Sequence, residues 1–256
     1  MSKSVLITGA AAGIGRATAL RFAAAGYIVG GFDVDRDGLA ALAADLGSRH
    51  VTGELDVRDA DGWRAALDAL TSRTGGELDV LVNNAGILRS GRFAEIPLAD
   101  QQRIIEVNVT GVLNGCHAAY PYLKRTQGAH VVNLASASAI YGQPELAAYS
   151  ASKFAVRGLT EALDLEWAGD DITVRALWPL FVNTAMVDGM DIASTRSLGI
   201  RLTADDVAEA VYDAVQPRRR LGGVHIAVGR QAKLMRAASD IAPSWMSRLV
   251  NKRLTS

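Results

Sequence analysis

The apolar positions of the chain follow two alternating patterns. Short, nearly uninterrupted apolar runs, typical of buried strands, alternate with segments whose apolar residues recur at helical spacing. The expected strands are 4–8, 27–32, 51–57, 78–82, 129–134, 173–177 and 223–228. The expected helices are 17–24, 39–46, 61–71, 98–123, 148–167 and 203–215. This alternation predicts an α/β fold, a Rossmann-type doubly wound parallel sheet of about seven strands with helices on both faces, formed by 1–256 as a single domain.

A glycine-rich turn joins the first strand to the first helix. It contains Gly9, Gly13 and Gly15. Glycine lets the backbone turn tightly and approach a ligand closely, and the free N–H groups at the start of a helix favour a phosphate. Because the turn lies between a strand and a helix, it predicts a dinucleotide site, with a turn that serves only packing as the alternative.

Acidic residues follow the second and third strands. Asp33 stands where dinucleotide-binding units place the acid that binds the adenosine ribose. Its carboxylate, at about 4 Å, would repel a 2′-phosphate by about 4 kcal/mol at an effective dielectric near 20. NAD is therefore favoured over NADP, although Arg36 is close enough to weaken this preference. Asp56 is expected to face the same edge, with a capping or solvated aspartate as the alternative.

Two asparagine positions carry further signals. The fourth strand ends in the sequence Asn83-Asn84-Ala85-Gly86, whose amides can lie against a flat ligand and join neighbouring loops by hydrogen bonds. Asn108 lies in the middle of an expected helix, where asparagine is unfavourable. Its amide therefore either kinks and hydrates the helix or has another role.

The stretch 136–153 gathers a hydroxyl, a phenol and an ammonium. Ser136 follows the fifth strand, and Tyr149 and Lys153 lie one turn apart on the next helix. A nearby ammonium favours the phenolate, so we expect the pKa of Tyr149 to fall from its usual value near 10 toward the range of general acid–base catalysis. A tyrosine and a lysine can also share a helix face by chance, so the other motifs decide.

The last third of the chain contains less regular segments. Residues 184–202 are apolar without a clean period and follow a strand end, which is typical of a substrate lid. The C-terminal tail, 231–256, carries more basic than acidic residues. It is expected to be an interface arm or part of the lid, with a membrane-surface helix as the alternative.

Composition narrows the classes of partner. The 27 basic and 27 acidic residues give a net charge of +0, so there is no overall field that would attract nucleic acid. The single cysteine, Cys116, cannot form an internal disulfide, and no apolar run is long enough for a membrane span. We expect a cytoplasmic protein with no membrane span and no metal site.

Taken together, the motifs resemble the single-domain branch of the short-chain dehydrogenase/reductase family. They occur in the order typical of that family, and the match extends from Val5 to about Val228. The motifs are Thr8-Gly9-x-x-x-Gly13-x-Gly15, Asn83-Asn84-Ala85-Gly86, Asn108, Ser136 and Tyr149-x-x-x-Lys153.

The resemblance implies a role for each motif. Tyr149 would be the acid–base, and Lys153 would lower its pKa and hold the nicotinamide ribose. Ser136 would bind the substrate oxygen, and Asn108 would steady a water that links Lys153 to solvent. The implied cofactor-binding residues are Gly9, Gly13, Ile14, Gly15, Asp33, Asp56, Val57, Asn83, Ala85, Gly86, Tyr149, Lys153, Pro179, Val182 and Thr184. The implied substrate contacts are Ser138, Leu180 and Met186.

One position departs from the family pattern. Leu180 follows Pro179 where the family usually has glycine, while Val182 and Thr184 match and are expected to contact the nicotinamide amide. If the position requires positive φ, a leucine would be strained by about 1 to 2 kcal/mol. Otherwise the turn has shifted and the leucine side chain narrows the pocket.

The expected function is that of an NAD-dependent oxidoreductase that interconverts a hydrophobic secondary alcohol and a ketone by hydride transfer. The alternatives are an NADP-dependent 3-oxoacyl reductase and a non-catalytic dinucleotide-binding regulator. The resemblance also implies a homo-oligomer, a tetramer or dimer paired through the helices of Asn108 and Tyr149.

Overall fold

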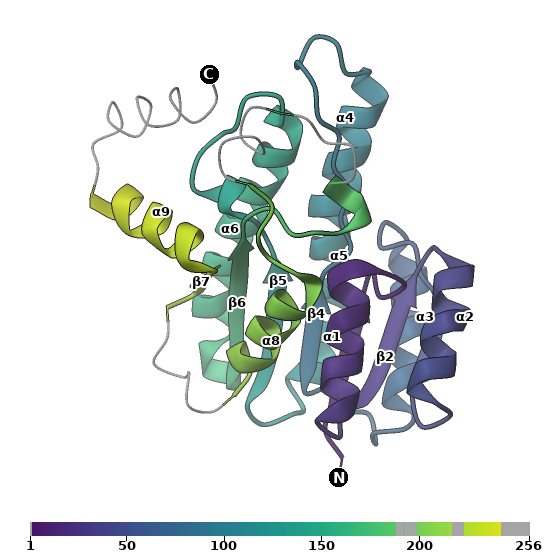
Figure 1. Cartoon of the computed structure of the whole chain (residues 1–256). Coiled ribbons are helices and arrows are strands. Elements are labelled where there is room, and N and C mark those ends of the chain that lie inside the picture. Colours follow the sequence, from purple (N-terminus) through teal and green to yellow (C-terminus); the bar gives the residue numbers. More distant parts are fainter. Residues whose placement is uncertain (1, 188–191, 193–198, 217–222, 242–256) are drawn as a thin grey trace.

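The computed structural model contains one parallel seven-stranded sheet (Figure 1). It describes residues 2–187, 192, 199–216 and 223–241. The strand order is β3-β2-β1-β4-β5-β6-β7, so the order reverses between β1 and β4. The strands are β1 (Ser4–Thr8), β2 (Ile28–Asp33), β3 (Val51–Glu54), β4 (Val80–Asn83), β5 (Ala129–Leu134), β6 (Ile172–Pro179) and β7 (His225–Val228).

Helices cover both faces of this sheet, which confirms the doubly wound fold (Figure 1). Their bounds are α1 (Gly13–Ala24), α2 (Arg36–Leu46), α3 (Ala60–Thr71), α4 (Leu98–Ile105), α5 (Gly111–Leu123), α6 (Ala147–Glu166), α8 (Ala204–Ala214) and α9 (Arg230–Ile241). Short 3₁₀ turns occupy Ala137–Ala139, Ala168–Asp170 and Ala185–Val187. The helices α3, α5 and α6 pack on one face, and α1, α2 and α8 pack on the other.

The alternation of side chains within each strand produces the two cores. In β1, Leu6 packs into the core with α3 and α5, whereas Val5 and Ile7 pack into the core with α1 and α8. All three are fully buried, as expected for a parallel sheet covered on both faces. Burying each such side chain contributes about 1.5–3 kcal/mol relative to leaving it exposed. The sheet is therefore a firm support for the loops at its carboxyl edge.

Two element boundaries near that edge differ from those expected from the sequence. The third strand ends at Glu54 instead of residue 57, so Asp56 lies in the following turn. The helix expected over 98–123 is interrupted by a π-helical turn, Glu106–Thr110, which contains Asn108. Such turns insert an extra residue into a helix and often occur at functional sites. Thr203 caps the start of α8, where it forms a capping box with Asp206.

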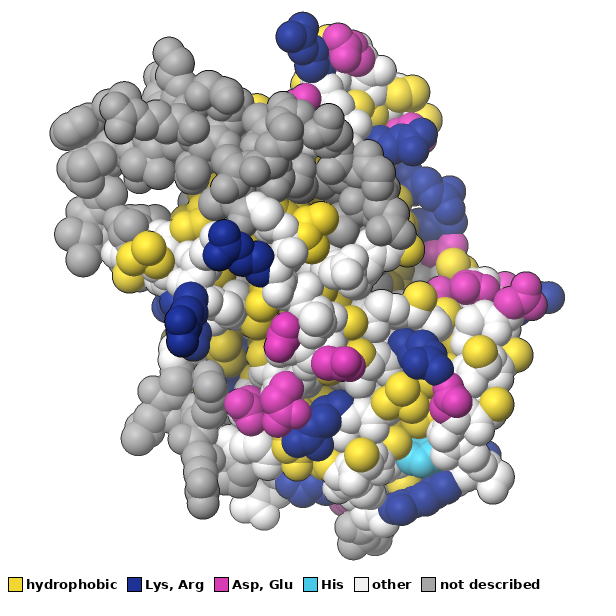
Figure 2. Space-filling view, in the orientation of Figure 1, with side chains coloured by type: hydrophobic (Ala, Val, Ile, Leu, Met, Phe, Trp, Pro, Cys, Tyr) yellow, Lys and Arg dark blue, Asp and Glu magenta, His cyan; other side chains and the backbone are white. Residues whose placement is uncertain are grey.

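The surface and the remaining segments add two findings. Acidic and basic side chains are interspersed over the described part of the face in Figure 2. Among the residues that the structure describes, no helix combines the length and apolar character that crossing a membrane requires. The expected lid and tail fall partly outside the described residues, which include 184–187, 192 and 199–202 of the lid and α9 of the tail.

Candidate active site

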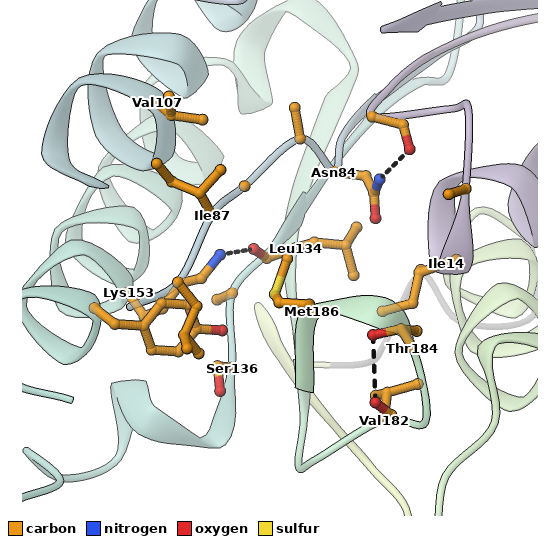
Figure 3. Close-up of a pocket in the computed structure, with 18 of the residues that line it drawn as sticks. Ile14, Asn84, Ile87, Val107, Leu134, Ser136, Lys153, Val182, Thr184 and Met186 are labelled. Atoms are coloured by element: carbon orange, nitrogen blue, oxygen red, sulfur yellow. Dashed lines mark hydrogen bonds between the residues drawn. The ribbon is translucent and has the colours of Figure 1, made fainter. Parts of the chain in front are cut away.

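A cavity of about 370 Å³ lies at the carboxyl edge of the sheet. This is the place where open α/β sheets bind ligands, beside the point of strand-order reversal. Most of the predicted site residues line it: Gly9, Gly13, Ile14, Asp33, Asp56, Val57, Ala85, Gly86, Ser136, Ser138, Tyr149, Lys153, Pro179, Leu180, Val182, Thr184 and Met186. The structure therefore brings residues that are far apart in the sequence into one pocket (Figure 3).

The glycine turn forms the first wall of the pocket. Gly9 and Gly13 have φ of +66° and +52°, which other residues rarely adopt. Gly15 does not line the cavity, and a Cβ built there would lie 1.9 Å from the carbonyl oxygen of Gly9. The absence of a side chain at Gly15 lets α1 pack closely against the turn, and its cofactor contact stays a prediction.

The start of α1 fits a phosphate group. Ala12 precedes the helix, and no side chain within the described residues caps the first N–H groups. The first turn of α1 also lacks an acidic residue. Its N–H groups and the positive end of the helix dipole are thus free for an anion, so the turn fits the pyrophosphate of a dinucleotide.

The carboxylate of Asp33 is fixed at the edge of the same pocket. One oxygen accepts a hydrogen bond from Ala11 N–H at 2.9 Å, and the other accepts from Val34 N–H at 2.7 Å. Arg36 is the residue that weakened the sequence argument for NAD, and its guanidinium contacts a different carboxylate. Its Nε lies 2.7 Å from the carboxylate of Glu54. The negative charge of Asp33 therefore faces the pocket without a direct contact from Arg36.

Asp56 lines the pocket together with a partner that the sequence analysis missed. Arg58 donates from Nε to both carboxylate oxygens of Asp56 at 3.0 Å and also reaches Glu106 at 3.3 Å. The hydrogen bonds from Arg58 lower the pKa of Asp56, so this carboxyl group stays charged. An arginine two residues after an aspartate is too common in turns to have been singled out.

The two asparagines after β4 point in different directions. Asn83 is buried and donates to Asn133 Oδ1 at 2.9 Å, so its side chain faces the interior and not the pocket. As the last residue of β4, Asn83 turns its side chain into the interior, so only its backbone can make the predicted cofactor contact, which stays a prediction. Asn84 donates to Thr8 O at 2.8 Å and to Gly9 O at 3.1 Å (Figure 3). This confirms that the segment ties neighbouring loops together.

Asn108 is fully buried behind the pocket instead of lining it. Its amide accepts from Ile87 N–H at 2.8 Å and donates to Ile87 O at 2.9 Å and Ser152 Oγ at 3.1 Å. A Cβ on Gly86 would lie 3.3 Å from Asn108 Oδ1 and 3.7 Å from Lys153 Nζ. Asn108 thus links the loop after β4 to α6 close to the ammonium of Lys153.

Lys153 and Tyr149 lie on one face of α6, as predicted, but their pKa values differ from the expectation. Lys153 Nζ donates to Leu134 O at 2.7 Å and is 5.4 Å from the centre of the Tyr149 ring (Figure 3). Burial lowers the pKa of Lys153 to about 8 and raises the pKa of Tyr149 to about 12, with a hydrogen bond from Ser136 opposing the rise. The expected fall in the pKa of Tyr149 is therefore wrong for the protein alone, because burial disfavours both charged forms.

The opposite wall of the pocket is apolar. Leu146, Phe181 and Ile192 form a cluster on which three partly buried side chains pack, those of Leu88, Tyr149 and Leu180. Among described residues other than glycine, positive φ occurs only at Glu145 and Asp171, so the strain considered for Leu180 is absent. Leu180 instead lines the pocket, as the alternative interpretation proposed.

Several pocket residues were not assigned from the sequence. They include Leu88, Arg103, Gln143 and Phe181, in addition to Arg58. Phe181 lies beside Leu180 and Val182, and Gln143 lies within the stretch 136–153, and only this proximity in the chain could have indicated them. Within the described residues, no group of three His, Cys, Asp or Glu side chains could hold a metal ion.

Comparison with known proteins assigns the chain to a family. A family model described as short chain dehydrogenase matches residues 3–193. A 3-oxoacyl-[acyl-carrier-protein] reductase of Thermotoga maritima is 36% identical over 191 residues, which cover 73% of this chain and 76% of that protein. A D-threitol dehydrogenase of Mycolicibacterium smegmatis is 36% identical over 72% of each chain.

Solved structures agree with this assignment. The crystal structure of the Brucella melitensis 3-ketoacyl-(acyl-carrier-protein) reductase complexed with NADH superposes with a TM-score of 0.82. The two sequences are 33% identical, and the superposition covers 88% of this chain and 96% of the other. The protein is therefore an oxidoreductase that belongs to the short-chain dehydrogenase/reductase family.

Proposed function

We propose that this protein is an NAD-dependent oxidoreductase that interconverts a hydrophobic secondary alcohol and its ketone. One observation carries the proposal. The glycine turn with Asp33 and the group Ser136, Tyr149 and Lys153 line the same pocket. A dinucleotide bound at the first would place its reactive end toward the second.

The chain supplies the proton chemistry and the geometry of this reaction. A bound nicotinamide cofactor would supply the hydride chemistry. Tyr149 would take the hydroxyl proton of the alcohol, or give a proton to the ketone oxygen in the reverse direction. The raised pKa keeps the phenol protonated, which suits ketone reduction, so alcohol oxidation should accelerate at alkaline pH. Ser136 Oγ accepts from Ser138 N–H at 3.2 Å, which fixes the hydroxyl that would orient the substrate oxygen.

Cofactor choice rests on the charge at the end of β2. Asp33 lines the pocket where the adenosine ribose would bind, and Arg36 pairs with Glu54 instead of Asp33. Both features favour NAD over NADP. The alternative, an NADP-dependent 3-oxoacyl reductase, is favoured by the likeness to the Thermotoga maritima reductase.

The apolar wall supports a hydrophobic substrate. Leu180 and Phe181 line the pocket next to Tyr149, and Met186 adds a further apolar contact. We propose that 184–202 is a lid on this site. Leu202 O accepts from Asn183 N–H at 2.8 Å, which closes the base of the segment, and Ile192 packs against the apolar cluster.

A homo-oligomer remains part of the proposal. Ile105, Leu113 and Phe154, on α4, α5 and α6, expose 39%, 45% and 41% of their surface, which suits a contact between copies. Light scattering that gives the mass of a tetramer or dimer would support this, and a monomer at micromolar concentration would contradict it.

The test is absorbance of reduced nicotinamide during incubation with secondary alcohols and, in reverse, with ketones and a 3-oxoacyl thioester. NAD and NADP are compared in parallel, and Tyr149→Phe is the control. Turnover with NAD that the control lacks supports the proposal. Turnover with NADP alone favours the acyl reductase, and cofactor binding without any turnover favours a non-catalytic regulator.

A further inference from the structure

Gln143 places an amide with an unused hydrogen-bonding atom in the wall of the pocket. The residue is only 3% exposed, yet it lines the cavity that contains Tyr149. Its Oε1 has no hydrogen-bond partner among the residues that the structure describes. Its Nε2 lies 3.5 Å from the hydroxyl of Tyr141, at the long limit for a hydrogen bond. The side-chain amide of Gln143 is thus buried with most of its hydrogen-bonding capacity unused.

The backbone of Gln143 is anchored to the catalytic helix. Its N–H donates to Ser150 Oγ at 3.1 Å, and its carbonyl accepts from Leu146 N–H at 3.2 Å. Ser150 follows Tyr149 in α6, and Leu146 belongs to the apolar cluster behind the pocket. The backbone that carries the amide is therefore held in place relative to Tyr149.

The proposed reaction leaves this amide free for a different group. Ser136 and Tyr149 already provide the hydroxyl groups that the reacting oxygen needs. A wholly apolar substrate would leave the Gln143 amide buried without a partner, and such a loss weakens binding by roughly tenfold or more. A second hydroxyl on the substrate would remove this penalty, because a hydroxyl can both donate to Oε1 and accept from Nε2.

We propose that Gln143 determines specificity by binding a second hydroxyl close to the reacting carbon. The substrates would then be diols, and the hydroxy ketones formed from them, whose remaining carbons pack on Leu180 and Phe181. This inference rests on the proposed function and narrows its substrate class from hydrophobic alcohols to amphipathic ones.

Two matched pairs of alcohols test it on the full chain. The pairs are 2,3-butanediol with 2-butanol and 2,4-pentanediol with 2-pentanol, so that the members of each pair differ by one hydroxyl. Wild type should oxidise at least one diol with a kcat/KM roughly tenfold or more above that of its monoalcohol. Gln143→Met has a side chain of similar length that cannot form this hydrogen bond. It should lose the preference through a higher KM for the diol and a lower KM for the monoalcohol, because the amide that the monoalcohol leaves without a partner is gone.

Controls separate this inference from folding and from the proposed function. The same substitution on the exposed face of α4, Gln102→Met, should leave both substrates unchanged. If Gln143→Met fails to melt cooperatively, Gln143→Asn, which retracts the amide by one methylene, should lose the preference instead. Equal activity of wild type on diol and monoalcohol in both pairs, or a preference that survives removal of the amide, overturns the inference and leaves the function intact. If wild type turns over none of these four alcohols but is active on another alcohol or ketone, the inference fails and the proposed function stands. If wild type is active on no alcohol and no ketone with NAD or NADP, both fail.

Discussion

The two ends of the pocket differ in whether their ionisable side chains are stabilised in the charged form or in the neutral form. At the nucleotide end, lined by the glycine turn, Asp33 and Asp56, each carboxylate is stabilised by donors such as Ala11 N–H or the Arg58 guanidinium. At the reaction end, Tyr149 and Lys153 are buried, and burial moves both pKa values toward the neutral forms. In the proposed function, the first end holds fixed charges that recognise the cofactor, whereas the second end disfavours the charged forms of the groups that transfer the proton.

This difference has a consequence for mutation. A recognition charge near the surface acts through Coulomb forces that water and salt screen. A buried tyrosine that transfers the proton would act directly at the reacting atoms. We expect no other side chain of the pocket to replace it in that step. Substitutions at the reaction end should therefore change rates most, and substitutions at the nucleotide end should mainly change which cofactor is used.

The largest effect is expected at the reaction end, from Tyr149→Phe. Removing the hydroxyl removes the proton acceptor, so kcat should fall by roughly 10²–10⁴-fold. The ring packs on the apolar cluster and would remain, so the affinity for NADH should change little. Steady-state kinetics and fluorescence titration of NADH measure the two quantities. A variant that keeps more than a tenth of the wild-type kcat would contradict the role of Tyr149.

At the nucleotide end, Asp33→Asn should change the choice of cofactor more than the rate. Replacing the carboxylate by an amide removes the repulsion of a 2′-phosphate while an oxygen remains to accept from Ala11 N–H. The ratio of kcat/KM for NADP to that for NAD should rise by roughly tenfold to a thousandfold. Glu54→Gln, which releases Arg36, is the matched variant and should shift the ratio in the same direction by less. An unchanged ratio in Asp33→Asn would refute the charge argument.

The buried ammonium should make stability depend on pH. The pKa of Lys153 is about 8 in the folded protein and near 10.5 when unfolded, so between these values the unfolded chain holds a proton that the native protein has released. Native stability should therefore rise with pH in this window, by at most about 1.4 kcal/mol per pH unit, and be flat below it. The raised pKa of Tyr149 has the opposite effect on stability, but only above pH 10, where the unfolded chain loses a phenol proton that the native protein keeps.

Urea unfolding of wild type and Lys153→Met at pH 7, 8, 9 and 10 measures this contribution. The free energy of unfolding of wild type minus that of the variant should increase from pH 8 to pH 10. A difference that stays constant over this range would mean that the ammonium is not desolvated.

The smallest effect is expected from Leu180→Gly, which restores the residue typical of the family. Removing the side chain from the apolar wall should widen the pocket and lower KM several-fold for ketones with a bulky substituent. Small ketones should be less affected. The measurement is a series of ketones of increasing size, and a change that is equal across the series would show that Leu180 does not limit the pocket.

Local patterns were sufficient for much of this fold and site. The alternation of apolar runs predicted the sheet, and the strand ends located Asp33, Ser136 and the glycine turn. Which of Asn83 and Asn84 faces the core was not predicted, because it depends on how β4 is seated between β1 and β5.

The pKa values could not be predicted in the same way. Helical spacing placed Tyr149 and Lys153 together, but the ammonium donates to Leu134, a residue of β5. That contact and the burial of both groups arise from tertiary packing. The unsatisfied amide of Gln143 is likewise invisible in the sequence, because it depends on which partners the fold fails to provide.

The central claim is that Tyr149 supports hydride transfer between an alcohol carbon and a nicotinamide in this pocket. The most direct test uses a secondary alcohol that carries deuterium on the reacting carbon, incubated with NAD and the protein, followed by mass spectrometry of the reduced cofactor. We expect one deuterium in NADH from wild type and none above background from Tyr149→Phe. Unlabelled NADH, or equal labelling with the variant, would contradict the claim.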